Sequence, residues 1–176
     1  GGPCSTPQEF FTNASAKPYF KRRLRYIAAR WGYLPNIVWE TFNEMDFTNG
    51  YNSAAITAWH QEMVPYLKTA DLNRHMVSVS FSDPGVEDAN VFSLPEIDFT
   101  GYHRYSGSAS MEDEHVAFTQ AERLAYGKPV LGGETGISGG STVSSRSAAP
   151  VSRSPASSSR TSVTGIPSAP PMKLAP

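Results

Sequence analysis

The last 39 residues of the chain, from Ser138 to Pro176, differ in composition from everything before them, and this break limits where a folded core can form. They include 12 Ser, 6 Pro and four basic residues, with no acidic or aromatic residue. A segment with no aromatic residue and few large apolar side chains buries too little surface to offset the conformational entropy that folding costs. We therefore predict one folded region at residues 1–137 and a disordered, Ser/Pro-rich tail at residues 138–176.

The folded region holds every aromatic residue, 11 basic residues and all 16 acidic residues, a net charge of −5 within a chain of net charge −1. This balance predicts neither a nucleic-acid partner nor a membrane partner, and no apolar run approaches the roughly 18 residues of a membrane span. The single Cys4 can form neither an internal disulfide nor a Cys-rich metal site. The opening residues show no targeting signal, which leaves the compartment undecided, and nothing indicates the oligomeric state.

Helical and strand patterns alternate through residues 1–137. Short β-branched and aromatic runs predict strands at residues 37–42, 76–81, 97–102 and 129–133. Helices are predicted at residues 16–32, with Ser15 as N-cap, at 53–69, ending or kinking near Pro65, and at 111–126. Each helix has a stripe of apolar residues expected to face the core, including Trp31 in the first, Trp59 in the second, and Ala117, Ala121, Leu124 and Ala125 in the third.

This alternation is typical of a parallel βα architecture, in which amphipathic helices cover short apolar strands. In a β/α barrel the functional groups gather where the strands end, because the following loops build the active face. Three of the predicted strands end in polar residues, namely Asn43 with Glu44, His103 with Tyr105, and Glu134. We therefore expect these side chains to share one face of the fold.

Two glutamates at the ends of different strands are suited to cleavage of a glycosidic bond. One carboxylic acid gives a proton to the leaving oxygen, while an ionised carboxylate attacks or stabilises the anomeric carbon. A glutamate after a strand is more often an exposed loop residue or a neighbour of a helix N-cap, so position alone leaves the roles of Glu44 and Glu134 open.

Local sequence adds a resemblance. IVWETFNEMDF (37–47) is similar to the acid/base signature of clan A glycoside hydrolases, and KPVLGGETG (128–136) is similar to their nucleophile signature. Between them, GYHRYS (101–106) resembles the His-x-Tyr strand end of glycoside hydrolase family 5 and its cellulase-like relatives. The chain thus resembles a family 5 catalytic domain, of the cellulase and mannanase type, over most of residues 1–136.

The resemblance implies a (β/α)8 barrel and a retaining hydrolase of β-linked polysaccharides or oligosaccharides. It implies that Glu44 is the general acid/base, that Glu134 is the nucleophile, and that Asn43 binds the sugar 2-hydroxyl. Tyr105 would hold Glu134, and His103 would line the sugar site or join the same network, although both could instead cap the barrel core. Nothing in the sequence indicates a metal or an organic cofactor.

Further aromatic and acidic residues surround Glu44 in the sequence. Phe47 and Tyr51, in the loop after it, are candidates for stacking on sugar rings, whereas Trp39 is expected in the core. Asp46 could contact the substrate, act on Glu44 through its charge, or cap a loop.

The resemblance implies that the predicted strands correspond to strands four to seven of the family barrel, about half of a domain of roughly 250 residues. A Ser/Pro-rich segment in place of the eighth strand suggests out-of-frame translation or a miscalled end. An open sheet exposes unpaired edges, so we expect this chain alone to be inactive or poorly soluble. The alternatives to an active glycosidase are an inactive remnant and a non-catalytic carbohydrate-binding relative.

Overall fold

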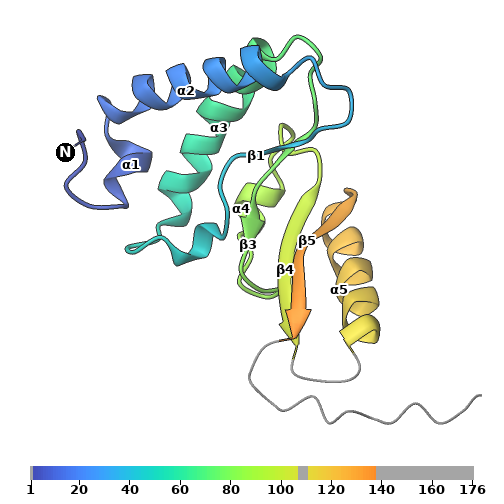
Figure 1. The fold of residues 1–176 in the computed structure, drawn as a ribbon. Helices are drawn as coiled ribbons and strands as arrows, with labels where there is room; N and C mark the ends of the chain where they lie inside the picture. Colours follow the sequence, from blue (N-terminus) through green and yellow to red (C-terminus); the bar gives the residue numbers. More distant parts are fainter. Residues whose placement is uncertain (1, 107–110, 138–176) are drawn as a thin grey trace, which may run out of the picture. The chain divides into compact units, whose positions relative to one another are not determined.

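Helices and strands alternate in the computed structural model, which describes residues 2–106 and 111–137, all within a unit that spans Gly1–Gly140 (Figure 1). The helices are α1 (Glu9–Thr12), α2 (Ala16–Trp31), the 3-10 turn η1 (Met45–Phe47), α3 (Ser53–Ala70), α4 (Ala89–Phe92) and α5 (Met111–Tyr126). The strands are β1 (Trp39–Glu40), β2 (Val77–Ser78), β3 (Ser80–Phe81), β4 (Thr100–Ser106) and β5 (Val130–Ile137). The predicted tail at 138–176 lies outside the described residues.

Every strand pairing in the described part of the chain is parallel, as predicted. β1 pairs with β2, and β3, β4 and β5 pair in that order. β2 and β3 are separated only by Val79, and the amide of Ser80 donates to the Phe42 carbonyl at 3.2 Å, just beyond β1. Four extended segments therefore follow one another in chain order, although these residues form no closed barrel.

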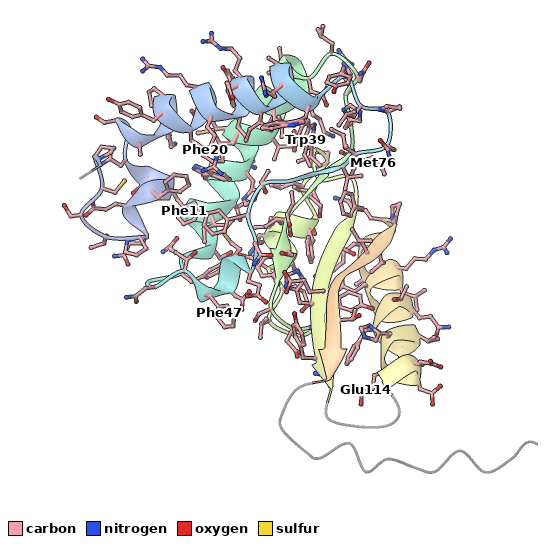
Figure 2. All side chains as sticks on the ribbon, viewed as in Figure 1. Phe11, Phe20, Trp39, Phe47, Met76 and Glu114 are labelled. Carbon is pink, nitrogen blue, oxygen red and sulfur yellow. The ribbon has the colours of Figure 1, made fainter. Side chains whose placement is uncertain are left out.

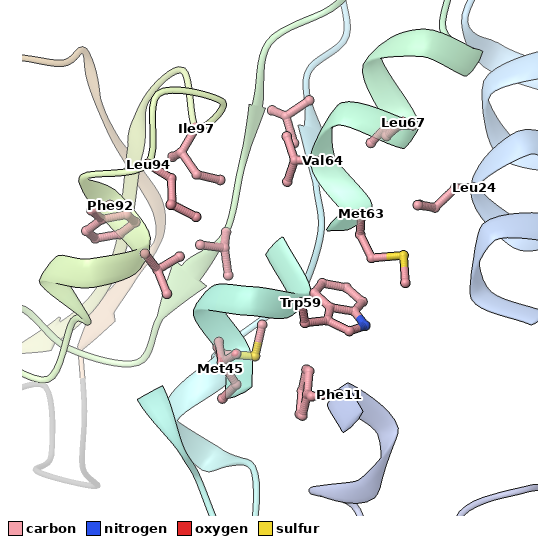
Figure 3. Close-up of a cluster of buried hydrophobic side chains, with 14 of the residues drawn as sticks. Phe11, Leu24, Met45, Trp59, Met63, Val64, Leu67, Phe92, Leu94 and Ile97 are labelled. Atoms are coloured by element: carbon pink, nitrogen blue, oxygen red, sulfur yellow. The ribbon is translucent and has the colours of Figure 1, made fainter. Parts of the chain in front are cut away.

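The core is built around α3, which packs against α2, α1 and α4 (Figure 1). The predicted stripe of α3 is confirmed, because Ile56, Trp59, Met63 and Leu67 are all buried. Trp59 lies between Phe11 and Met63, and Phe92, Leu94 and Ile97 form the other side of the same cluster (Figure 3). Burying a side chain of this size is worth about 1.5–3 kcal/mol. Pro65 does not end α3, which continues to Ala70.

The start and the last turn of α2 differ from the prediction. The side chain of Ser15 makes no capping hydrogen bond; instead Asn13 Oδ1 accepts from the amides of Ser15 at 2.8 Å and Ala16 at 3.2 Å. Leu24 and Ala28 are buried as expected, but Trp31 is 42% exposed. Its indole packs edge-to-face on Tyr26 at the surface, so the prediction of a core position for Trp31 was wrong.

The prediction for the inner face of α5 was also wrong, because Ala117, Ala121 and Ala125 are exposed and Leu124 is 87% exposed. The face that meets β4 instead carries His115, Phe118 and Glu122. Tyr102 stacks on His115, with a ring-centroid distance of 5.7 Å, and the Arg104 guanidinium lies 5.1 Å from the Phe118 ring centroid. The bulky residues that β4 directs toward α5 select this face over the stripe of small residues.

A buried carboxylate joins the segments that precede β1 and β2. Asp71 accepts hydrogen bonds from Trp39 Nε1 at 2.8 Å and from His75 Nδ1 at 2.7 Å, while His75 Nε2 lies 2.7 Å from the Leu34 carbonyl. Trp39 is therefore anchored at the edge of the core, where it packs against the buried cluster. Among the described residues, no helix is both long and apolar enough to cross a membrane.

Candidate active site

Glu44 follows β1 in a backbone conformation that is rare for any residue other than glycine. Its φ of 46° and ψ of 59° lie in the left-handed region, which costs on the order of 1–3 kcal/mol for a residue with a Cβ. The amide of Glu44 donates to Ser80 Oγ at 3.1 Å, and the Ser80 amide donates to the Phe42 carbonyl. Buried Ser80 thus holds both sides of the turn that presents the Glu44 side chain.

A second attachment joins the same turn to the segment after β3. Asp46 accepts a hydrogen bond from the Ser82 amide at 2.8 Å through Oδ1, and a short one from the Ser82 hydroxyl through Oδ2. Of the three roles considered for Asp46, the structure supports loop capping. Ser80 and Ser82 are two residues apart, as residues on one side of an extended segment are, and each holds one end of the Glu44–Asp46 turn.

A register shift between β4 and β5 determines which way Glu134 points. Tyr102 pairs with Gly132, but the next pair is His103 with Glu134, so Gly133 is an extra, unpaired residue. Without this bulge His103 would pair with Gly133, and Glu134 would lie on the opposite face, with Arg104. The bulge therefore places Glu134 on the face that carries His103 and Tyr105.

His103, Tyr105 and Glu134 lie within the strands rather than at their ends, because β4 and β5 continue to Ser106 and Ile137, farther than predicted (Figure 1). His103 is buried, and its Nδ1 lies 2.9 Å from Glu44 Oε1 and 3.6 Å from Glu134 Oε2. One carboxylate oxygen of Glu44, one of Glu134 and one ring nitrogen of His103 all lie within 4.8 Å of one another. The structure thus brings both predicted carboxylates to one imidazole.

Tyr105 completes the cluster by donating from its phenol to Glu134 Oε2 at 2.8 Å. This hydrogen bond, together with desolvation and the charges of both glutamates, raises the pKa of Tyr105, so the phenol remains a donor. A Cβ added at Gly136 would lie 3.1 Å from two atoms of the Tyr105 ring. Glycine at position 136 therefore leaves the ring the room it needs to reach Glu134.

A cavity of about 820 Å³ opens beside Glu44. Asn43 and Phe47 border it, and aromatic side chains from the core supply much of its wall, namely Phe10, Phe11, Phe20 and Phe42. Phe47 is 71% exposed, on the outer side of η1 (Figure 2). Asn43 and Phe47 are therefore accessible on the same side of the turn as Glu44.

Tyr51 is not brought to the glutamates. Its ring packs against the buried cluster, and its phenol donates to Asp88 Oδ2 at 2.6 Å. Burial, the hydrogen bond to Asp88 and the charges of Asp88 and Asp46 raise the pKa of Tyr51 far above its ordinary value. The placement of Tyr51 is that of a structural residue joining two loops, and a sugar-stacking role for it has no support in this arrangement.

The sequence that forms this cluster is similar to that of known proteins. The family model of cellulase, glycosyl hydrolase family 5, matches residues 6–159, which include all the residues of the cluster. The chain belongs to glycosyl hydrolase family 5. Family 5 implies a (β/α)8 barrel, of which the described residues supply successive parallel strands and their helices. The matched family is one of glycosyl hydrolases.

Several curated plant proteins are similar to this family 5 chain. Mannan endo-1,4-beta-mannosidase 5 of Solanum lycopersicum is 24% identical over 149 residues, covering 68% of this chain and 36% of the relative. Mannan endo-1,4-beta-mannosidase 4 of Oryza sativa subsp. japonica is 30% identical over 92 residues, covering 47% and 19%. Mannan endo-1,4-beta-mannosidase 1 of Arabidopsis thaliana is 25% identical over 130 residues, covering 58% and 31%. The chain spans about a third or less of the length of these relatives.

The three donor groups of the family 5 cluster are also of the types that ligate metal ions. Their hydrogen bonds, however, already use the relevant atoms, because His103 Nδ1 meets Glu44 and the Tyr105 phenol meets Glu134. A cation at this position would have to displace the contact between His103 Nδ1 and Glu44. Both contacts, of His103 with Glu44 and of Tyr105 with Glu134, are thus hydrogen bonds within the cluster.

Sequence reasoning missed three supporting features of the family 5 site. Ser80 and the Gly133 bulge have no local signal, because a serine in a strand and a pair of glycines are compatible with many environments. Arg104 had a weak local signal in the sequence. It lies between His103 and Tyr105, so strand alternation directs it to the opposite face, where it pairs with Asp83 at 2.8 Å and Glu114 at 3.0 Å. These ion pairs connect the outer face of β4 to α5 and to the loop after β3.

Proposed function

We propose that this family 5 chain carries the catalytic pair of a retaining endo-glycosidase that cleaves β-linked polysaccharides. The observation that carries the proposal is that both glutamates lie against the imidazole of His103. One carboxylate oxygen of each glutamate and one ring nitrogen lie within 4.8 Å of one another. Retaining glycosidases hold their carboxyl groups about 5–5.5 Å apart, whereas inverting enzymes leave about 6.5–9.5 Å for a water molecule. The close approach of Glu44 and Glu134 supports retention.

The hydrogen bonds support an assignment of roles. The phenol of Tyr105 donates to Glu134, which favours an ionised, oriented carboxylate and therefore a nucleophile. Glu134 would attack the anomeric carbon and form a glycosyl ester, while Glu44 protonates the departing oxygen. Glu44 would then take a proton from the water that hydrolyses the ester, restoring both groups. His103, which contacts both carboxylates, would hold them in position relative to each other. Exposed Asn43 would bind the sugar beside the cleavage point.

For the substrate, we propose a β-1,4-linked mannan, because the similar curated proteins are named mannan endo-1,4-beta-mannosidases. Phe47, exposed beside Glu44, would supply an apolar surface for a pyranose ring. We further propose that the described strands correspond to strands four to seven of the family barrel.

The experiment is hydrolysis of β-mannan, cellulose and xyloglucan by the 176-residue chain and by the full-length product of its gene. Glu44→Gln and Glu134→Gln are compared with Glu112→Gln, an exposed residue of α5. We expect both site variants to lose at least about a thousandfold in kcat, with the control unchanged. NMR of the first product would show retention. Activity that survives Glu134→Gln would overturn the assignment, and inactivity of both wild-type proteins on every glycan would favour a remnant or a binding relative.

A further inference from the structure

The outer face of α2 carries aromatic and arginine residues that alternate at helical spacing. Tyr19, Arg22, Tyr26 and Arg30 follow one another at intervals of three or four residues, the spacing of neighbours on one helix face, and Tyr33 lies in the turn just beyond the end of α2. Tyr19 and Tyr26 are each 61% exposed and Tyr33 is 73% exposed. Large aromatic rings gathered on a surface typically mark a binding site, because isolated exposed rings are common but clusters are not.

The C-terminal end of this face is hollowed. Tyr26, Ala29, Arg30, Trp31 and Tyr33 line a surface depression of about 520 Å³. The rings of Tyr26 and Trp31 meet edge-to-face, with centroids 6.2 Å apart and an interplanar angle of 85°. Both residues line the depression, and Tyr26 is 61% and Trp31 42% exposed, so ring surface is accessible to a ligand with flat apolar faces.

The side chains of α2 carry a net positive charge next to the depression. The helix has two lysines and four arginines but no acidic residue. Lys17 and Lys21 each pair with Glu62 of α3 at 2.7 Å. Within the described residues, none of the four arginines forms an ion pair. Arg22 lies over the Tyr19 ring, at 5.4 Å from its centroid, and Arg30 lines the depression. An arginine here can donate two parallel hydrogen bonds to a carboxylate.

The depression is separate from the glutamates. Trp31 and Tyr33 precede β1, whereas Glu44 follows it, so the two sites lie at opposite ends of the same strand. A ligand seated between Tyr26 and Tyr33 would therefore not occupy the cleavage position. Its binding can be measured in a variant that lacks a catalytic glutamate.

We propose that this depression is a second carbohydrate-binding site, for a polysaccharide that carries carboxylate groups. Apolar faces of pyranose rings would pack on Tyr26, Trp31 and Tyr33, while Arg30 pairs with a carboxylate. A single arginine within the depression suits a glycan with occasional charges better than a nucleic acid, which presents a phosphate at every residue. The site does not depend on the catalytic assignment, because it rests on α2 and the turn that follows it.

Two soluble β-glucans that differ in charge, carboxymethylcellulose and hydroxyethylcellulose, test the proposal by affinity electrophoresis of the 176-residue chain. All proteins carry Glu134→Gln, which prevents hydrolysis during the measurement. We expect Tyr26→Ala with Tyr33→Ala to weaken binding of carboxymethylcellulose about tenfold or more, as for the loss of well-buried aromatic contacts. Arg30→Gln should weaken binding of carboxymethylcellulose but not of hydroxyethylcellulose.

Matched controls remove similar groups elsewhere. Leu72→Ala truncates a side chain that is 94% exposed, and Arg123→Gln removes an exposed arginine from α5. Unchanged binding in both controls, with circular dichroism unchanged in every variant, supports a specific site. The proposal is overturned if the tyrosine variants bind like the parent, if Arg123→Gln has the same effect as Arg30→Gln, or if single-stranded DNA binds as tightly as carboxymethylcellulose.

Discussion

The backbone amide of Glu44 donates a hydrogen bond to the side-chain oxygen of Ser80 at 3.1 Å, which links the proposed acid/base to the neighbouring strand. Glu44 has a positive φ, and a residue with a Cβ keeps such a conformation only where its surroundings enforce it. Ser80 supplies part of that enforcement from a buried position. It touches the backbone of Glu44 rather than the reacting atoms, so its role is positioning.

Ser80→Ala should therefore reduce kcat about tenfold to a hundredfold, because the Glu44 turn loses one of its attachments. The free energy of unfolding should fall by only about 1 kcal/mol, the usual net worth of one hydrogen bond. Ser78→Ala is the matched control, since Ser78 is equally buried in β2 but its hydroxyl lies within hydrogen-bonding distance of the Val79 and Phe99 carbonyls instead. Steady-state kinetics and thermal denaturation separate the two effects. Equal losses of kcat in the two variants would contradict a positioning role.

Gly136→Ala should affect the part of the site around Glu134, across from the Glu44 turn. The new methyl group would lie 3.1 Å from the Tyr105 ring, which must shift and weaken its hydrogen bond to Glu134. We expect kcat to fall about tenfold, with little further loss when Tyr105→Phe is added, because both changes remove one contact. Gly132→Ala is the control, since its methyl group would lie at an ordinary 3.5 Å from Tyr102. Additive effects of Gly136→Ala and Tyr105→Phe would show that the two residues act independently.

The meeting of Glu44, His103 and Glu134 was predictable because it depends on topology. Parallel strands in chain order bring their carboxyl-terminal halves to one edge, whatever their lengths. The finer geometry was not predictable. The Gly-Gly pair before Glu134 does not show which residue bulges, yet a shift by one residue would turn Glu134 toward α5.

Errors in helix faces have a different cause. The spacing of Ala117, Ala121 and Leu124 indicates an apolar stripe on α5. A stripe of mostly small residues does not by itself determine which face of the helix packs against the sheet. The partner strand decides, and Tyr102 requires the side that carries His115. Likewise, no spacing rule distinguishes Trp31 at a surface depression from Trp59 in the core, because both lie on regular stripes.

Asp71→Asn should destabilise the fold by about 2–4 kcal/mol, because Asp71 is almost fully buried and accepts bonds from Trp39 and His75. Burial alone would raise the pKa of Asp71, but hydrogen bonds from Trp39, His75 and Asn73 outweigh burial and lower it. A lowered pKa in the folded state means that this stabilisation is present above the unfolded-state pKa and is lost as pH falls through the folded-state value.

Urea denaturation between pH 3 and pH 7 checks this expectation, with exposed Asp113→Asn as control. The destabilisation by Asp71→Asn should be largest near neutral pH and should shrink as pH falls through the folded-state pKa of Asp71, because protonation then removes the same charge from the wild type. A loss that is equal at both ends of the range would show that packing, and not the charge of Asp71, is responsible.

Glu122 should make the fold less stable as pH rises, so its effect on the pH dependence of stability is opposite to that of Asp71. It is buried on α5, and burial, together with a hydrogen bond to Glu87 and the charge of Glu87, raises the pKa of Glu122 to about 7. Between about pH 4.5 and pH 7 the folded state binds more protons than the unfolded state, so the free energy of unfolding decreases with pH. Glu122→Gln removes this titration and should raise stability at pH 8 by about 1–3 kcal/mol relative to the wild type. Denaturation at pH 5 and pH 8, with exposed Glu112→Gln as control, measures the difference, and a Glu122→Gln curve parallel to that of the wild type would contradict the assignment.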